Sequence, residues 1–206
     1  MTGDIEKHHE PQRLSDKAAA LCVHMLRKLA DCYFGRNYIR RSIVIETVAA
    51  LPGMIGGKFQ HYKALRWMRP EPGWIRTLLD EAENERMHLM TFLAVGKPTC
   101  FDRILVWPVQ FVFCVVYSLF YVLSPRACHR FVGYLEEEAT HSYTLFLGEI
   151  DAGHIANAPA PAIALELWKL PENALLRDVV IAVRADEMRH RDVNHALADR
   201  MGGKVS

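Results

Sequence analysis

The 206-residue sequence predicts an all-α protein in which long helices pack as a bundle. Apolar residues recur at steps of three and four over most of the chain, and no segment alternates as an exposed strand does. Proline and glycine interrupt this pattern only at a few places, such as 71–73 and 96–98, so the periodic segments between them are long. Hydrophobic residues make up 50% and charged residues 24% of the chain, which is ample for a folded core.

The expected helices follow in order along the chain. They cover residues 15–33, about 38–67, about 74–95, 104–123, from Pro125 to about Ile150, and about 172–200. The second helix is expected to kink or to pack closely near Pro52, and a Pro/Ala-rich loop is expected over 153–161. The expected organisation is an N-terminal arm over 1–14, a single helical domain over 15–200 and a tail over 201–206.

Composition excludes some classes of function. The net charge is +1, so no basic excess indicates nucleic-acid binding. The five cysteines form no Cys-x-x-Cys pair, and their odd, scattered arrangement favours reduced thiols over a disulfide framework. The first residues lack the apolar core of a signal peptide, which leads us to expect a chain that needs no export or is already processed.

The segment 104–123 is apolar enough to cross a bilayer, and basic residues flank it on both sides. Three interpretations compete at this point: a spanning helix, a buried bundle helix, and a helix that lies in one leaflet. A single spanning helix would place the helices before and after it in different compartments. The polar residues described next come from both sides, which argues against a spanning helix.

Polar residues stand in the apolar stripe of the last helix. This stripe comprises Leu176, Val180, Val183, Glu187, His190, Asn194 and Leu197. A carboxylate and an imidazole therefore occupy core positions, where an isolated charge costs on the order of several kcal/mol. A bound metal ion would remove that cost.

The third helix repeats the arrangement, because Glu85 and His88 are again three residues apart on an apolar side. The stripe of the fifth helix contains Glu136, and that of the second helix contains Glu46. Two helices thus supply one glutamate each and two supply Glu-x-x-His, which is the ligand set of ferritin-like di-iron bundles. The sequence therefore predicts a ferritin-like four-helix bundle, with iron bound by carboxylates and imidazoles.

At these positions the sequence resembles the alternative oxidases, the cyanide-insensitive quinol oxidases of mitochondria and some bacteria. The resemblance rests on four motifs in order and on a fifth short one: Ile45-Glu46-Thr47, Asn84 to Leu89, Leu135 to Thr144, Arg184 to His195, and Trp168 to Pro171. It runs from about residue 8 to residue 200. It implies a ubiquinol:oxygen oxidoreductase that reduces dioxygen to water without pumping protons.

The resemblance also implies roles for individual residues. Two iron ions would be bound by Glu46, Glu85, His88, Glu136, Glu187 and His190. Tyr143 matches a tyrosine proposed to be redox-active. Outer positions around the metals correspond to Asn84, Trp168 and Asp186, and the quinol pocket corresponds to Arg41, Ser42, Leu135, Glu138, Ala139 and Ser142. Where many members have a tyrosine this chain has Leu167, so one hydrogen-bonding phenol near the site is missing.

Finally, the resemblance implies a homodimer held on one leaflet of a membrane by two helices, here 15–33 and 104–123. It thereby favours the interfacial interpretation of the apolar segment. Because no transit peptide is evident, we expect a bacterial protein on the cytoplasmic face of the inner membrane, with the matrix face of the mitochondrial inner membrane as the alternative. A di-iron quinone hydroxylase and a non-enzymatic iron-binding bundle remain the alternative functions.

Overall fold

The structure is a computed structural model that describes residue 5 and residues 7–203. Parts of the expected arm and tail, namely residues 1–4, 6 and 204–206, lie outside the described residues. The helices are α1 (Leu14–Phe34), α2 (Tyr38–Trp67), α3 (Trp74–Val95), α4 (Cys100–Leu123), α5 (Pro125–Asp151), α6 (Ala162–Trp168) and α7 (Leu176–Met201). The predicted all-α class is confirmed, and buried glutamate and histidine side chains on α2, α3, α5 and α7 are consistent with a di-iron four-helix bundle.

The structure differs from the sequence prediction at α4, α6 and α7. α4 begins at Cys100, earlier than the expected start at residue 104. The short helix α6 was not predicted, because its seven residues follow a Pro/Ala-rich segment that resembles a loop. α7 begins at Leu176, later than expected, because Pro171 starts a turn in which the Ala174 N–H donates to the Pro171 carbonyl. Leu175 then forms an isolated bridge with Pro159. α2 continues through Pro52 over 30 residues, and the close packing expected near Pro52 is present at Gly53.

Three helices have in their first turn an aspartate that accepts a backbone hydrogen bond from the residue before the helix. Asp16 accepts from the Arg13 N–H at 3.2 Å, Asp102 from the Thr99 N–H at 2.7 Å, and Asp178 from the Leu175 N–H at 2.9 Å. Each carboxylate satisfies an N–H that the helix itself leaves open, and its charge is favourable at the positive end of the helix dipole.

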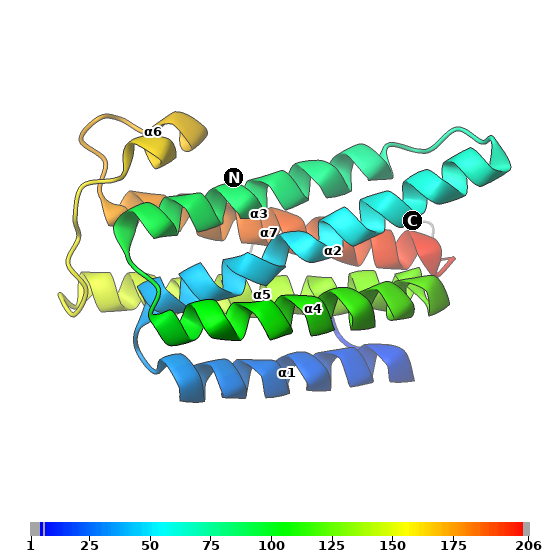
Figure 1. The fold of residues 1–206 in the computed structure, drawn as a ribbon, viewed down its shortest axis with the longest axis horizontal. Coiled ribbons are helices and arrows are strands. Elements are labelled where there is room, and N and C mark those ends of the chain that lie inside the picture. Colours follow the sequence, from blue (N-terminus) through cyan, green and yellow to red (C-terminus); the bar gives the residue numbers. More distant parts are fainter. Residues whose placement is uncertain (1–4, 6, 204–206) are drawn as a thin grey trace. The chain divides into compact units, whose positions relative to one another are not determined.

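The chain divides into two compact units, one containing the residues up to Tyr38 and from His129 onward, the other Ile39–Cys128. In the first unit, α5 and α7 run antiparallel, as Figure 1 shows. Arg130 at the start of α5 pairs with Asp199 near the end of α7, and Asp151 at the end of α5 pairs with Arg177. α1 runs parallel to α5, with Ala19 and Val23 packed on Tyr134.

In the second unit, α2 and α3 form an antiparallel hairpin, as Figure 1 shows, and the two helices pack closely at Gly53. A Cβ atom at Gly53 would lie 2.5 Å from the carbonyl oxygen of Leu78, so only glycine allows this separation of the two helices. Gly96, the residue that follows α3, lies against Ile39 of α2. A Cβ atom at position 96 would be 2.4 Å from Ile39 Cγ2.

α4 runs parallel to α2 and is joined to it by polar contacts at three places. Arg40 pairs with Asp102, Gln110 donates to the Thr47 carbonyl at 2.7 Å, and Gln60 donates to the Tyr121 hydroxyl at 3.1 Å. These contacts account for the polar residues within an otherwise apolar segment. They hold α4 in place although only 11% of its most apolar stretch is buried.

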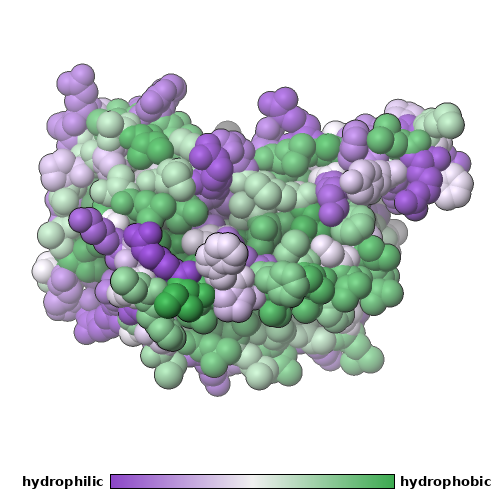
Figure 2. All heavy atoms as spheres, viewed as in Figure 1, coloured by the Kyte–Doolittle hydropathy of each residue, from purple (hydrophilic) through white to green (hydrophobic). Residues whose placement is uncertain are grey.

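The remaining surface of α4 is apolar and exposed. Figure 2 shows hydrophobic residues gathered along this helix, and the most exposed are Ile104, Trp107, Phe111, Leu119, Val122 and Leu123. A buried bundle helix, one of the three interpretations of this segment, is therefore ruled out. By length and composition α2 and α4 are both able to cross a membrane, but 44% of the apolar stretch of α2 is buried. On α1 the large apolar side chains Leu21, Met25 and Leu29 are likewise exposed.

Substituting Gly53 with alanine should destabilise the protein by about 1–3 kcal/mol, because the added methyl group forces α2 away from the α3 backbone. Gly148 provides a matched control on α5, since nothing lies within 4 Å of an added Cβ there. Gly148→Ala should instead stabilise the helix, by about 0.5–1 kcal/mol. Thermal unfolding of both variants measures the difference, and equal effects would contradict the close packing of α2 on α3.

Candidate metal centre

Two glutamates and one histidine converge inside the second unit. Glu46 comes from α2, and Glu85 and His88 come from consecutive turns of α3. The Nδ1 atom of His88 lies 3.4 Å from Glu85 Oε2 and 3.9 Å from Glu46 Oε2. The ligand atoms of all three residues lie within 4.8 Å of one another, and none of the side chains is more than 4% exposed.

The first unit contains the same combination of residue types. Glu136 comes from α5, and Glu187 and His190 come from consecutive turns of α7. His190 Nδ1 lies 3.5 Å from Glu187 Oε2, and the three ligand atoms again lie within 4.8 Å of one another. We refer to each Glu-Glu-His group as a half-site; each unit thus contributes three of the six predicted ligands.

The chemistry of each half-site fits a metal ion. Two buried carboxylates at this separation repel each other and lose their hydration, so both can stay ionised only beside a cation. Within each half-site an imidazole nitrogen faces a carboxylate oxygen of the same helix, which is the arrangement that i, i+3 spacing produces on one face. Carboxylate oxygens with imidazole nitrogens are the donor set expected for non-haem iron.

Tyr143 lies on α5, seven residues after Glu136, and is 5% exposed. Two threonine hydroxyl groups near Tyr143 form hydrogen bonds along α5. Thr140 donates to the Glu136 carbonyl at 2.8 Å, Thr144 donates to the Thr140 carbonyl at 2.8 Å, and the Arg184 guanidinium donates to the Thr144 hydroxyl at 3.2 Å. The redox role of Tyr143 stays a prediction, while its buried position on the helix of Glu136 is established.

The predicted outer residues Trp168 and Asp186 are in contact. The indole Nε1–H of Trp168 donates to Asp186 Oδ2 at 2.9 Å, and α6 brings the tryptophan to this position. The other oxygen of Asp186 lies 2.9 Å from the Arg189 guanidinium. Sequence reasoning missed Arg189, although its i, i+3 spacing from Asp186 was a usable signal. Both carboxylate oxygens of Asp186 therefore have polar partners, even though Leu167 replaces the tyrosine that many family members have at that position. Asn84, on α3 next to Glu85, is half-buried.

The residues predicted to form a quinol pocket lie on two helices in different units. Arg41 and Ser42 are buried in the first turns of α2. On α5, Leu135, Glu138, Ala139 and Ser142 are half-buried. Arg27 of α1, which sequence reasoning missed, donates to Glu138 at 3.0 Å, and its guanidinium lies 2.9 Å from His141 Nε2. Glu138 thus points toward α1 and away from the half-site of its own unit.

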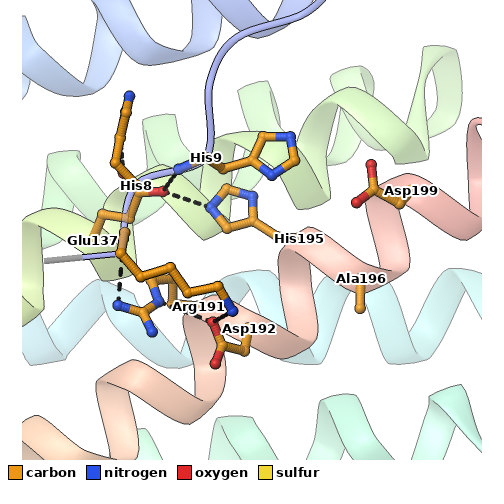
Figure 3. Close-up of a pocket in the computed structure, with 9 residues that line it drawn as sticks. His8, His9, Glu137, Arg191, Asp192, His195, Ala196 and Asp199 are labelled. Carbon is orange, nitrogen blue, oxygen red and sulfur yellow. Dashed lines mark hydrogen bonds and ion pairs between the residues drawn. The ribbon is translucent and has the colours of Figure 1, made fainter. Parts of the chain in front are cut away.

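A separate polar pocket of about 240 Å³ lies in the first unit, where residues from the N-terminal arm meet α5 and α7. In Figure 3 the side chains of Glu137 and His195 meet beside His8 and His9 of the arm. Burial raises the pKa of Glu137, but hydrogen bonds from His195, the His9 N–H and His8 outweigh it and hold that pKa below its ordinary value. None of the predicted iron ligands lines this pocket. The hydrogen bonds of His8 and His9 attach the N-terminal arm to Glu137, which is adjacent to Glu136 in the chain.

Comparison with known proteins decides the family. The model of the family described as alternative oxidase matches residues 3–199. This chain belongs to the alternative oxidase family. It is 56% identical to ubiquinol oxidase 1c of Arabidopsis thaliana over 97% of this chain and 60% of that protein. It is 56% identical to ubiquinol oxidase 2 of Nicotiana tabacum over 95% of this chain and 66% of that protein, and 57% identical to ubiquinol oxidase 1a of Oryza sativa over 95% and 59%.

Membership of this family of membrane-associated enzymes implies a non-haem di-iron centre, and the two buried half-sites carry the donor types that such a centre needs. The chain spans less than two thirds of the length of the three relatives named above. These relatives are mitochondrial, so the expectation of a bacterial protein is not supported. That expectation rested on the first residues of the chain, which carry no information about a leader segment when the match is partial.

Replacing Glu187 with alanine should reduce the iron content to less than about half of that of the wild type, because the half-site on α5 and α7 loses one of its three donors. The metal-free variant should unfold at the same or a higher temperature, since a buried charge is gone. Elemental analysis and thermal unfolding after chelation measure the two effects. Glu83→Ala, which removes an exposed glutamate paired with Arg86 on α3, is the control. Full iron content in the Glu187 variant would contradict the ligand assignment.

Proposed function

We propose that this chain is a ubiquinol:oxygen oxidoreductase that reduces dioxygen to water at a non-haem di-iron centre and pumps no protons. One observation carries the proposal: buried Glu-Glu-His groups occur in both units, within a chain that belongs to the alternative oxidase family. The names of the relatives add support, since three of them are ubiquinol oxidases of mitochondria. The balanced reaction consumes two ubiquinols per dioxygen and yields two ubiquinones and two waters.

The two half-sites would together hold the two irons, with Glu46, Glu85 and His88 from one unit and Glu136, Glu187 and His190 from the other. When bound, the irons would pass electrons from quinol to dioxygen. Asp186 would orient the neighbouring Glu187 through its contacts with Trp168 and Arg189, as outer carboxylates do around metal sites. Asn84 would act in the same way beside Glu85.

The residues proposed to bind quinol are Arg41 and Ser42 of α2 and Leu135, Glu138, Ala139 and Ser142 of α5. The guanidinium of Arg41 would hold a quinol oxygen by a charge-assisted hydrogen bond. The phenol of Tyr143 would supply an electron and a proton during dioxygen reduction and would regain both from quinol, so that two ubiquinols still provide all four electrons. Its burial keeps the residue away from bulk water.

The protein would lie on one leaflet of a membrane through the exposed apolar faces of α1 and α4, as a homodimer of single helical domains over residues 15–200. Exposed apolar side chains along α4 support this attachment, because a soluble monomer rarely exposes so many in a row. The matrix face of the mitochondrial inner membrane is the proposed location. Sedimentation with membranes that resists high salt, and the molecular mass in detergent, check the attachment and the dimer.

Membranes that contain this chain should consume oxygen when ubiquinol is supplied and cyanide is present. Cyanide inhibits oxidases that contain haem, and the proposed di-iron centre contains none. The uptake should vanish in the Glu187→Ala variant and persist in Glu83→Ala. An oxygen electrode measures both, and analysis of the quinone separates the alternatives. A hydroxylated quinone would indicate a hydroxylase. No uptake in the presence of bound iron would favour a non-enzymatic iron-binding bundle.

Replacing Tyr143 with phenylalanine should leave the iron content unchanged and lower turnover by about tenfold or more, since only the phenolic hydroxyl is removed. Tyr134, another buried tyrosine on α5, is the matched control, and Tyr134→Phe should retain turnover. Normal turnover in the Tyr143 variant would reject the redox role.

A further inference from the structure

A buried ion pair joins the beginning of α2 to the beginning of α4. The Arg40 guanidinium donates from Nε to Asp102 Oδ2 at 2.8 Å and from a terminal nitrogen to Asp102 Oδ1 at 2.7 Å. Asp102 is fully buried, and the Arg40 side chain is 22% exposed. A forked contact of this kind fixes both the distance and the orientation of its two partners.

Asp102 serves both helices at once. Its Oδ2 atom also accepts from the Thr99 N–H and the Thr99 hydroxyl, each at 2.7 Å, which caps the start of α4. Two adjacent arginines, Arg40 and Arg41, lie in the first turn of α2, where positive charge is unfavourable and no acidic residue is present. The carboxylate of Asp102 offsets this excess of positive charge within the same unit.

The first turn of α2 is also fixed sterically. Gly96 lies against Ile39, and an added Cβ atom there would be 3.3 Å from Ile43 Cδ1. Ile43 is 2% exposed and Arg41 is 6% exposed. Successive residues of a helix point about 100° apart, so the direction of Arg40 determines that of Arg41. The contacts of Arg40 and Ile39 together restrain the rotation of this turn about the helix axis.

We propose that the Arg40–Asp102 ion pair positions Arg41 for the quinol by locking the rotation of the first turn of α2. This inference rests on the proposed function, in which Arg41 holds a quinol oxygen. Arg40 and Asp102 are positioning residues, because they act through Arg41. The pair also couples quinol binding to α4, so the helix with the exposed apolar face sets the geometry of the substrate site.

The test uses the purified full chain loaded with iron, and compares Arg40→Lys with Arg76→Lys. Lysine keeps the charge of Arg40 but cannot make the forked contact. Arg76 pairs with Asp80 on the exposed surface of α3 in the same unit, which makes it the matched control. The measurements are the Kd of a short-chain ubiquinone from tryptophan fluorescence, the KM and kcat for the corresponding ubiquinol, the iron content and Tm.

For Arg40→Lys we expect Kd and KM to rise about tenfold, with kcat within about twofold and the iron content unchanged. Arg76→Lys should match the wild type in every measurement. The conservative variant Asp102→Glu should recover most of the affinity that Asp102→Asn loses. In addition, combining Arg40→Lys with Asp102→Asn should cost no more than Asp102→Asn alone.

Unchanged Kd and KM in Arg40→Lys would overturn the inference, as would a lower Tm and iron content without a change in Kd. Absence of ubiquinone binding by the wild type would overturn it as well. If the wild type binds ubiquinone but consumes no oxygen, the proposed oxidase function fails. A tenfold weaker Kd in Arg40→Lys would then still establish the positioning role in quinone binding.

Discussion

The burial of carboxylate pairs inside apolar helix faces is the constraint on which the rest of this structure depends. In each half-site the ligand atoms of two glutamates and one histidine lie within 4.8 Å of one another, and the side chains are almost fully excluded from water. Such a group is unfavourable in a protein core unless a cation compensates its charge. The energetic cost of burying these carboxylates and their affinity for a metal ion therefore have the same origin.

Close packing of the helices keeps these carboxylates in place. Gly53 lets α2 approach the α3 backbone, and Gly133 lets α5 approach His195, whose ring atoms would lie 2.5 Å from an added Cβ. On the α5–α7 pair, Asn194 donates to the carbonyl of His190 and lies 2.9 Å from His129. Each half-site is thus built on a pair of helices whose separation leaves little room for adjustment, which favours a fixed ligand geometry.

α4 illustrates how a helix can belong to the fold while exposing an apolar surface. Its polar contacts with α2, through Asp102, Gln110 and Tyr121, lie on the side that faces the protein. They supply directional contacts where little apolar surface is buried. The exposed side is free to meet lipid, and the substrate proposed here is itself apolar, so attachment and substrate delivery would use the same surface.

The sequence by itself determined the long helices, the six candidate ligands and the resemblance to the family, because each rests on local periodicity or on motifs whose residues are close in the chain. The i, i+3 spacing of Glu85 and His88, and of Glu187 and His190, already places each pair on one helix face. Only the tertiary structure decided the partners of isolated charges. Arg40 with Asp102, Arg27 with Glu138, and Arg36 with Glu149 are separated by more than sixty residues. The sequence pattern around a charged side chain does not identify its ion-pair partner, because that partner depends on which helices pack together and at what register.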